Sequence, residues 1–359
     1  MIVLSDILGN HQINLYTDLF YNLKNSNAQF AYFYLPKRID YGISLFHYSY
    51  LYYTYFIQDD WLYYGYLRDR NYGFNLYASR PFNRFNRLDL TLTGLNIERD
   101  LVALNPYYYY YPVGDFEKEM GNIYKRNALF LHLGYTTDTA LWGATGPVNG
   151  KRSNISLTYS PMVSKSRGIE FWTVKGDYRK YFRIARDYSM ALRFSGGYSG
   201  GRNPQRFLLG GMSNWINYKY RDVTDRILYD DFFFFSSFEM PLRGTPYYEV
   251  IGSKFMLANM EFRFPLIRYL IFGGLLPIGF QNIRGVLFMD MGSAFDDYDA
   301  WRPLESGKFL KLQDMRAGYG FGARINVGFF LLRYDLAWQT DFYSSARSPI
   351  HYFSLGADF

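Results

Sequence analysis

Cysteine is absent from this chain of 359 residues. Its absence excludes disulfides, thiolate nucleophiles and cysteine-ligated metals, and it is compatible with an oxidising compartment. Long apolar runs are also missing, because polar or charged residues interrupt every stretch before it reaches the roughly 18 residues that a spanning helix requires. The sequence therefore excludes a membrane protein built from helices.

Signals for catalysis and for nucleic-acid binding are scarce. The four histidines lie far apart, with no His-Glu-x-x-His spacing. The net charge is +7, but lysines and arginines are scattered singly, without the basic run that nucleic acid would favour. Asp6 and His11 are the nearest acid–histidine pair, and their turn makes hydrolysis the least supported function. We expect no catalytic residue, no cofactor, no metal and no nucleic-acid partner.

Aromatic residues, in contrast, are abundant. The chain has 38 Tyr, 33 Phe and 6 Trp, together 21% of its residues. Such side chains suit the headgroup boundary of a bilayer, where one end of a ring is wet and the other is in hydrocarbon. Compositional bias of the source genome is the alternative explanation. Since spanning helices are excluded, the one structure that can cross a bilayer with its main chain satisfied is a closed β-barrel.

Alternation with period two is the main secondary-structure signal. Leu88, Leu90 and Leu92 alternate with polar residues, and the same pattern recurs to the C-terminus. A soluble sandwich also alternates, but the longest runs here reach roughly nine to twelve residues, which suits a tilted spanning strand. We predict an all-β transmembrane antiparallel β-barrel that occupies residues 1–359 as a single domain.

The pattern gives about fifteen strands from Ile2 onward, and bacterial barrels usually have an even number. A further strand upstream of Met1 would give 16 strands, whereas merging Ile2–Asp6 with His11–Tyr21 would give 14. Residues Met1–Gly9 lack the features of a signal peptide, so we expect either the C-terminal part of a longer precursor or a mature chain.

Connections between the strands predict which side is periplasmic, because periplasmic turns are short and extracellular loops are long. The predicted short turns are Asn326–Gly328, Ala185–Asp187, Pro81–Arg84, Pro36–Asp40 and Leu8–His11, with longer periplasmic links at Asp138–Arg152 and Pro265–Gln281. The predicted outer loops are Gln58–Arg68, Arg99–Lys125, Gly200–Ser253 and Ala294–Leu310, and they hold the aromatic clusters Tyr107–Tyr111 and Phe232–Phe235. We expect these clusters to pack over the barrel mouth or at the headgroup girdle.

Strand parity predicts a charged lumen. Six charged residues share the polar face of their strands, namely Glu261, Arg263, Arg316, Arg324, Arg333 and Asp335. Their mixed signs suggest a salt-bridge network or a polar path through the barrel.

Four C-terminal features together resemble the bacterial surface antigen superfamily, which includes the BamA-like barrel insertases and the two-partner secretion transporters. They are the loop segment Pro241–Thr245 (PLRGT) followed by Asn259–Leu266, the Phe288–Gly292 strand motif (FMDMG), the glycine-rich Gly318–Gly322, and an ending on Phe359. Asp138 with Gly146–Arg152 resembles a periplasmic turn of the family. Leu4–His11 resembles a subgroup whose barrel follows a periplasmic TolB-like β-propeller.

The resemblance implies a lumen latch made by Arg243, Gly244, Asp290, Phe288 and Gly292, in which the loop arginine folds inward and pairs with the strand aspartate. Thr245 departs from the family pattern, because an aromatic residue is usual there, and this puts the packing of the loop tip in doubt. The alternating Phe353, Leu355, Ala357 and Phe359 correspond to the family's assembly signal. The expected location is the outer membrane of a bacterial cell.

Two functions are considered. The first is implied by the resemblance, and it is insertion or transport of proteins across the outer membrane, without ATP, through a weak seam between the first and last strands. The second is passive, as a channel for small solutes or an anchor for a periplasmic propeller domain. The expected partners are outer-membrane lipids and lipopolysaccharide, together with unfolded protein substrates or periplasmic domains.

Overall fold

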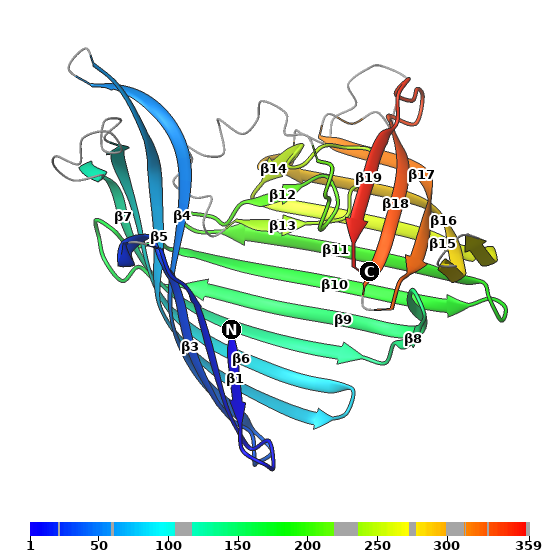
Figure 1. Ribbon diagram of the computed structural model, residues 1–359, viewed down its shortest axis with the longest axis horizontal. Helices are drawn as coiled ribbons and strands as arrows, with labels where there is room; N and C mark the ends of the chain where they lie inside the picture. Colours follow the sequence, from blue (N-terminus) through cyan, green and yellow to red (C-terminus); the bar gives the residue numbers. More distant parts are fainter. Residues whose placement is uncertain are drawn as a thin grey trace. The chain divides into compact units, whose positions relative to one another are not determined.

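The structure is a computed structural model that describes residues 1–20, 22–58, 61–104, 117–218, 236–272, 278–298, 312, 314–328 and 330–356. Its main feature is a 16-stranded antiparallel sheet in which neighbouring strands are mostly consecutive in the chain (Figure 1). The predicted all-β fold and the count of 16 strands are confirmed, although the sixteenth strand is the short β8, which pairs with β9 off the main path. In the described part of the chain no helix is long and apolar enough to span a bilayer.

The chain divides into two compact units, of which the first comprises residues 1–134 and 158–171. Long antiparallel hairpins dominate this unit, and the β4–β5 pairing runs from Asp40↔Ser79 to Gln58↔Trp61. The elements that lie in it wholly or in part are β1 (Ile2–Ser5), β2 (His11–Asp18), the 3-10 turn η1 (Leu23–Asn25), β3 (Asn27–Tyr34), β4 (Asp40–Gln58), β5 (Trp61–Asn83), β6 (Asn86–Leu104), β7 (Glu117–Asp138) and the end of β9 (Gly146–Ser160).

The second unit comprises residues 135–157 and 172–359. Besides the end of β7 and most of β9, the elements that lie in it wholly or in part are β8 (Leu141–Gly143), β10 (Phe171–Arg183), β11 (Ser189–Gly200), β15 (Lys254–Phe272), β16 (Ile278–Phe295), β17 (Met315–Asn326), β18 (Leu331–Thr340) and β19 (Ile350–Leu355). A small separate sheet of β12 (Phe207–Leu209), β13 (Ser237–Glu239) and β14 (Val250–Gly252) lies within the connection from β11 to β15.

Several predicted boundaries were wrong because the strands are longer than the sequence pattern suggested. The link predicted at Pro265–Gln281 is mostly strand, since β15 continues to Phe272 and β16 begins at Ile278. The link at Asp138–Arg152 contains the β8–β9 hairpin, in which Gly143 pairs with Gly146. The 14-strand alternative was also wrong, because β1 and β2 are separate strands that pair with each other.

On the long strands of the sheet, charged side chains are buried on one face and large apolar side chains are exposed on the other. On β16 the carboxylate of Asp290 is fully buried, whereas Leu287 is 50% exposed. On β18 Asp335 is fully buried beside Tyr334, which is 39% exposed. Sheets with buried charges and a broad exposed apolar face need hydrocarbon against that face. We call the face that carries Asp290 and Asp335 the inner face.

Candidate functional site

The inner face of β15 to β18 carries the polar rows on which the site is built. Strand pairing aligns Asn259, Asp290 and Gly318 in one row, and Glu261, Phe288 and Gly320 in the next. A third row holds Arg263 and Gly322, with Asp335 opposite Gly322 on β18. Because successive pairs with the same parity share a face, acids from three strands converge on one patch.

The long connection between β11 and β15 folds back onto this patch. Leu242 donates its N–H to the carbonyl of Gly211 at 2.9 Å, and Leu242 packs with Leu209 and Leu257 in a buried apolar cluster. This packing fixes the loop immediately before Arg243. The next residue, Gly244, has a φ of 92°, a left-handed conformation that favours glycine.

Arg243 is fully buried and is the centre of the site. Its Nε and Nη2 donate to the two carboxylate oxygens of Asp290 at 2.7 and 2.9 Å, and its main-chain N–H donates to Oδ2 at 3.0 Å. Its guanidinium lies 3.6 Å from the centre of the Phe288 ring. The bidentate pair and the stacked ring together define both the position and the plane of the guanidinium.

Further charges surround this pair and balance it. Arg243 Nη1 lies 2.8 Å from Glu261 and 3.5 Å from Asp335. Arg263 binds Glu261 at 2.7 Å, and Arg324 binds Asp335 at 2.6 Å. The cluster thus has three cations and three anions away from water, so each group depends on its partners for solvation.

Glycines on β17 provide the space that lets the loop approach. A methyl group at Gly318 would overlap the carbonyl oxygen of Arg243, and one at Gly322 would overlap a carboxylate oxygen of Asp335. On the loop side, a methyl group at Gly244 would lie 3.0 Å from the Gly318 Cα. The glycine-rich motif therefore allows the main chain of the loop to pack directly against the main chain of β17.

Tyr352 of β19 fastens the loop tip from the other side. Its fully buried hydroxyl accepts from the Gly244 N–H at 2.9 Å and donates to the Thr245 carbonyl at 2.6 Å. Thr245, in place of the aromatic residue that the family pattern led us to expect, is also fully buried, and its hydroxyl donates to the Leu242 carbonyl at 2.6 Å. The tip is therefore closely packed despite this departure.

The remaining predicted residues lie at several places. Gly292 makes room for leucines, since a methyl group there would lie 3.0 Å from Leu209. Arg316 contacts Glu249 at 3.3 Å, apart from the Asp290 patch. Arg333 donates to Ser354 at 3.1 Å and to the Ser213 carbonyl at 3.0 Å. Phe353 and Leu355 lie in β19, whereas Ala357 and Phe359 lie outside the described residues, as do the clusters Tyr107–Tyr111 and Phe232–Phe235.

Sequence reasoning missed two parts of the site. Tyr352 has the parity of the inner face, but its bonds to the loop could not be read from spacing. Asn259 was noted only as part of a motif, yet its amide donates to Asp290 at 2.8 Å and to the Pro241 carbonyl at 2.8 Å. It therefore joins the strand carboxylate to the loop main chain.

The arrangement is suited to holding a loop in place. Within the described residues no group of three or more potential ligands could hold a metal ion. The acids of the patch already bind arginines, and each arginine is held by at least one carboxylate. Paired in this way, these groups form a fastening between a loop and a sheet.

A family model for the Omp85 superfamily domain matches residues 11–359. The chain belongs to the Omp85 superfamily. This assignment confirms the resemblance recognised in the C-terminal motifs and identifies the chain as an outer-membrane protein. No curated protein matched the chain in a comparison of sequences.

Solved structures of Omp85 proteins share the fold. The chain is similar to BamA from Haemophilus ducreyi lacking POTRA domains 1–3, with a TM-score of 0.61 and 14% identity over 98% of this chain and 65% of that one. It is also similar to CdiB from Acinetobacter baumannii (TM-score 0.52, 14% identity, 98% and 55% covered) and to CdiB from Escherichia coli (0.55, 11%, 98% and 57%). The chain therefore spans less than two thirds of each of these structures.

Proposed function

We propose that this Omp85 barrel inserts proteins into the outer membrane or transports them across it, and that the Arg243 loop is the latch that fixes its wall during this work. The observation that carries the proposal is the complete burial of Arg243 against Asp290, with Glu261 and Asp335 beside it. Main-chain bonds between paired strands already hold the wall of a barrel, so we take the additional buried fastening of a loop as support for a barrel that works on other proteins. The proposed role is not enzymatic.

A protein that opens to admit another chain must break some contacts while keeping its own wall intact. Loss of one partner from a buried charge pair costs roughly 3–5 kcal/mol, because the other partner stays buried and unpaired. The latch therefore favours opening elsewhere in the barrel over deformation of β15 to β18, and the folding energy of the client supplies the work.

The test is a folding assay in vesicles. The full chain is reconstituted into phospholipid vesicles, an unfolded eight-stranded outer-membrane protein is added, and folding is followed by the heat-dependent shift of the client on SDS gels. We expect the parent chain to accelerate folding over empty vesicles, and Arg243→Ala to lose most of that acceleration while still inserting. Arg316→Ala, which removes an arginine outside the patch, is the matched control.

Planar-bilayer conductance separates this proposal from the passive alternative. Under the latch proposal, Arg243→Ala shows more frequent and larger openings than the parent chain. If neither protein accelerates client folding, and both conduct small ions identically and unfold at the same temperature, the latch and the assembly role are rejected and a passive channel or anchor is supported.

A further inference from the structure

A basic cavity lies at the end of the second unit that carries the turn from β10 to β11. It measures about 320 Å³ and lies between that turn and the stretch where the pairing of β15 with β16 is irregular. The charged residues that line it are Arg186, Arg268, Arg284 and Asp187. Three cations and one anion leave an excess of two positive charges at the cavity.

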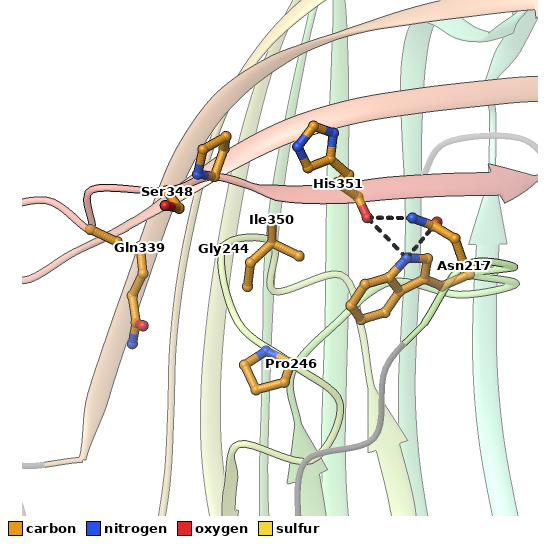
Figure 2. Close-up of a pocket in the computed structure, with 10 residues that line it drawn as sticks. Asn217, Gly244, Pro246, Gln339, Ser348, Ile350 and His351 are labelled. Atoms are coloured by element: carbon orange, nitrogen blue, oxygen red, sulfur yellow. Dashed lines mark hydrogen bonds between the residues drawn. The ribbon is translucent and has the colours of Figure 1, made fainter.

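A larger cavity, of about 610 Å³, lies beside β19 and has a different lining (Figure 2). Among the described residues that line it there is no lysine, arginine, aspartate or glutamate. Its polar groups bind one another, since Trp215 and Asn217 both donate to the His351 carbonyl at 3.1 Å. Of the two cavities, the basic one is therefore the one that attracts an anion.

The arginines of the basic cavity lack the acid partners that other arginines of this unit have. On the inner face, for example, Arg263 binds Glu261 at 2.7 Å. Arg186 and Arg268, in contrast, form no ion pair or hydrogen bond with any residue that the structure describes. Arg284 donates only to a main-chain carbonyl of the neighbouring turn, at 3.4 Å. Because like charges repel when no acid separates them, a bound anion would stabilise this group of arginines.

The backbone is irregular where the arginines meet. The register between β15 and β16 shifts after the pair Pro265↔Arg284, which leaves Leu266 as an extra residue in β15. On the opposite strand Asn282 has a φ of 56°, a left-handed conformation that few residues other than glycine adopt. A bulge redirects the side chains that follow it, and Arg268 follows this one. The bulge thus helps to place arginines of two strands at one cavity.

Exposed apolar side chains lie next to the charged lining. Leu266 is 51% exposed, and Tyr269, which itself lines the cavity, is 71% exposed. Ile184, at the start of the β10–β11 turn, is 59% exposed. Such apolar surface is unfavourable in water, whereas the boundary of a bilayer places anionic headgroups directly beside acyl chains. The combination favours the phosphate of a lipid over phosphate that is free in water.

We propose that the basic cavity binds the phosphate of an anionic phospholipid at the membrane boundary, with the acyl chains against Leu266 and Tyr269. Arginine suits this ligand, because a guanidinium donates two parallel hydrogen bonds to phosphate oxygens. The bound lipid joins the β10–β11 turn to the bulge of β15 and so fixes the depth of this end of the barrel in the membrane. Lipid binding at this site is independent of any role of the chain in protein assembly.

The test measures lipid binding to the full chain in detergent micelles. Because the chain lacks cysteine, Ala185→Cys in the exposed β10–β11 turn carries a single fluorophore beside the cavity. Phosphatidylglycerol with a nitroxide on its acyl chain, close to the headgroup, quenches this fluorophore when it binds nearby. Phosphatidylcholine with the same nitroxide is the comparison, because its choline cation compensates the charge of the phosphate.

The test variant adds Arg186→Gln and Arg268→Gln, which remove two exposed cations from the cavity. The matched control adds Arg183→Gln and Arg347→Gln instead, because these two arginines are exposed but do not line the cavity. The heat-dependent gel shift shows that each protein is folded.

We expect the labelled parent chain and the control to prefer phosphatidylglycerol over phosphatidylcholine by at least about tenfold in mole fraction. The test variant should bind phosphatidylglycerol about 25-fold more weakly, because each arginine near an anionic headgroup contributes about a factor of five. Equal quenching by the two lipids in the parent chain, or an equal loss of binding in the test variant and the control, would overturn the proposal.

Two competitors identify the source of the anion. Inorganic phosphate and a hexaglutamate peptide are each added at millimolar concentration to the complex with phosphatidylglycerol, and we expect neither to displace the lipid. Displacement by inorganic phosphate would assign the cavity to free phosphate, and displacement by the peptide would assign it to an acidic protein segment. Either displacement would overturn the assignment to a lipid.

Discussion

Gly318→Ala is the smallest change that should release the latch. The added methyl group would overlap the Arg243 carbonyl oxygen, so the loop main chain must move away by roughly 1 Å or more. The bonds from Arg243 to Asp290, at 2.7 and 2.9 Å, would then lengthen beyond hydrogen-bond distance. Because both groups are fully buried, we expect the free energy of unfolding to fall by about 3–5 kcal/mol.

The measurement is urea unfolding of the chain in phospholipid vesicles, followed by tryptophan fluorescence. Gly176→Ala in β10 is the matched control, because a methyl group there meets nothing within 4 Å. In an Arg243→Ala background, Gly318→Ala should lower the free energy of unfolding much less, since the two changes disturb the same contact. Equal unfolding free energies for Gly318→Ala and Gly176→Ala in the parent background would show that the contact between Gly318 and the Arg243 loop does not stabilise the fold.

Tyr352→Phe should lower the free energy of unfolding by about 1–3 kcal/mol, because the buried Gly244 N–H and Thr245 carbonyl lose their partner, and urea unfolding against Tyr343→Phe measures it. Leu287→Arg, on the exposed apolar face, should lower the free energy of unfolding in vesicles by about 2–4 kcal/mol. An equal effect of Arg347→Leu, in the exposed connection between β18 and β19, would contradict the assignment of the apolar face to lipid. In the loop after β16, burial raises the pKa of Asp296, but hydrogen bonds from Arg206 and Ser253 outweigh burial and hold that pKa below 3.8. The carboxylate therefore stabilises the fold above pH 3.8 and loses this effect as the pH falls through the lowered pKa. The small difference in unfolding free energy between the parent chain and Asp296→Asn should therefore vanish in acid.

The sequence was sufficient to predict the fold and the pattern of the inner face. Period-two alternation depends only on side-chain direction within a strand, so the parity of Glu261, Arg263, Asp290 and Asp335 could be assigned before any pairing was known. Strand ends were harder to place. Polar residues such as Arg68 resemble loop residues in the sequence, but Arg68 lies within β5 and binds Asp100.

Contacts between distant segments could not be predicted in the same way. The bonds of Asn217 and Trp215 to β19 join residues more than 130 positions apart. No local periodicity reports such a contact, because the loop sequence has no regular spacing. The run of glycines on β17 suggests that another segment approaches this strand closely. The strand pattern does not indicate that the segment is the loop containing Arg243.

The sheet face opposite the charged patch is expected to lie against the hydrocarbon of the bilayer. Single cysteines at Leu287, Phe321 and Arg347, labelled with nitroxides in reconstituted vesicles, test it directly, because oxygen gathers in the bilayer whereas a nickel chelate stays in water. We expect labels at Leu287 and Phe321 to collide with oxygen and to be shielded from nickel, whereas the label at Arg347 behaves in the opposite way. If the labels at Leu287 and Phe321 were as accessible to nickel as the label at Arg347, the barrel and the latch within it would be contradicted.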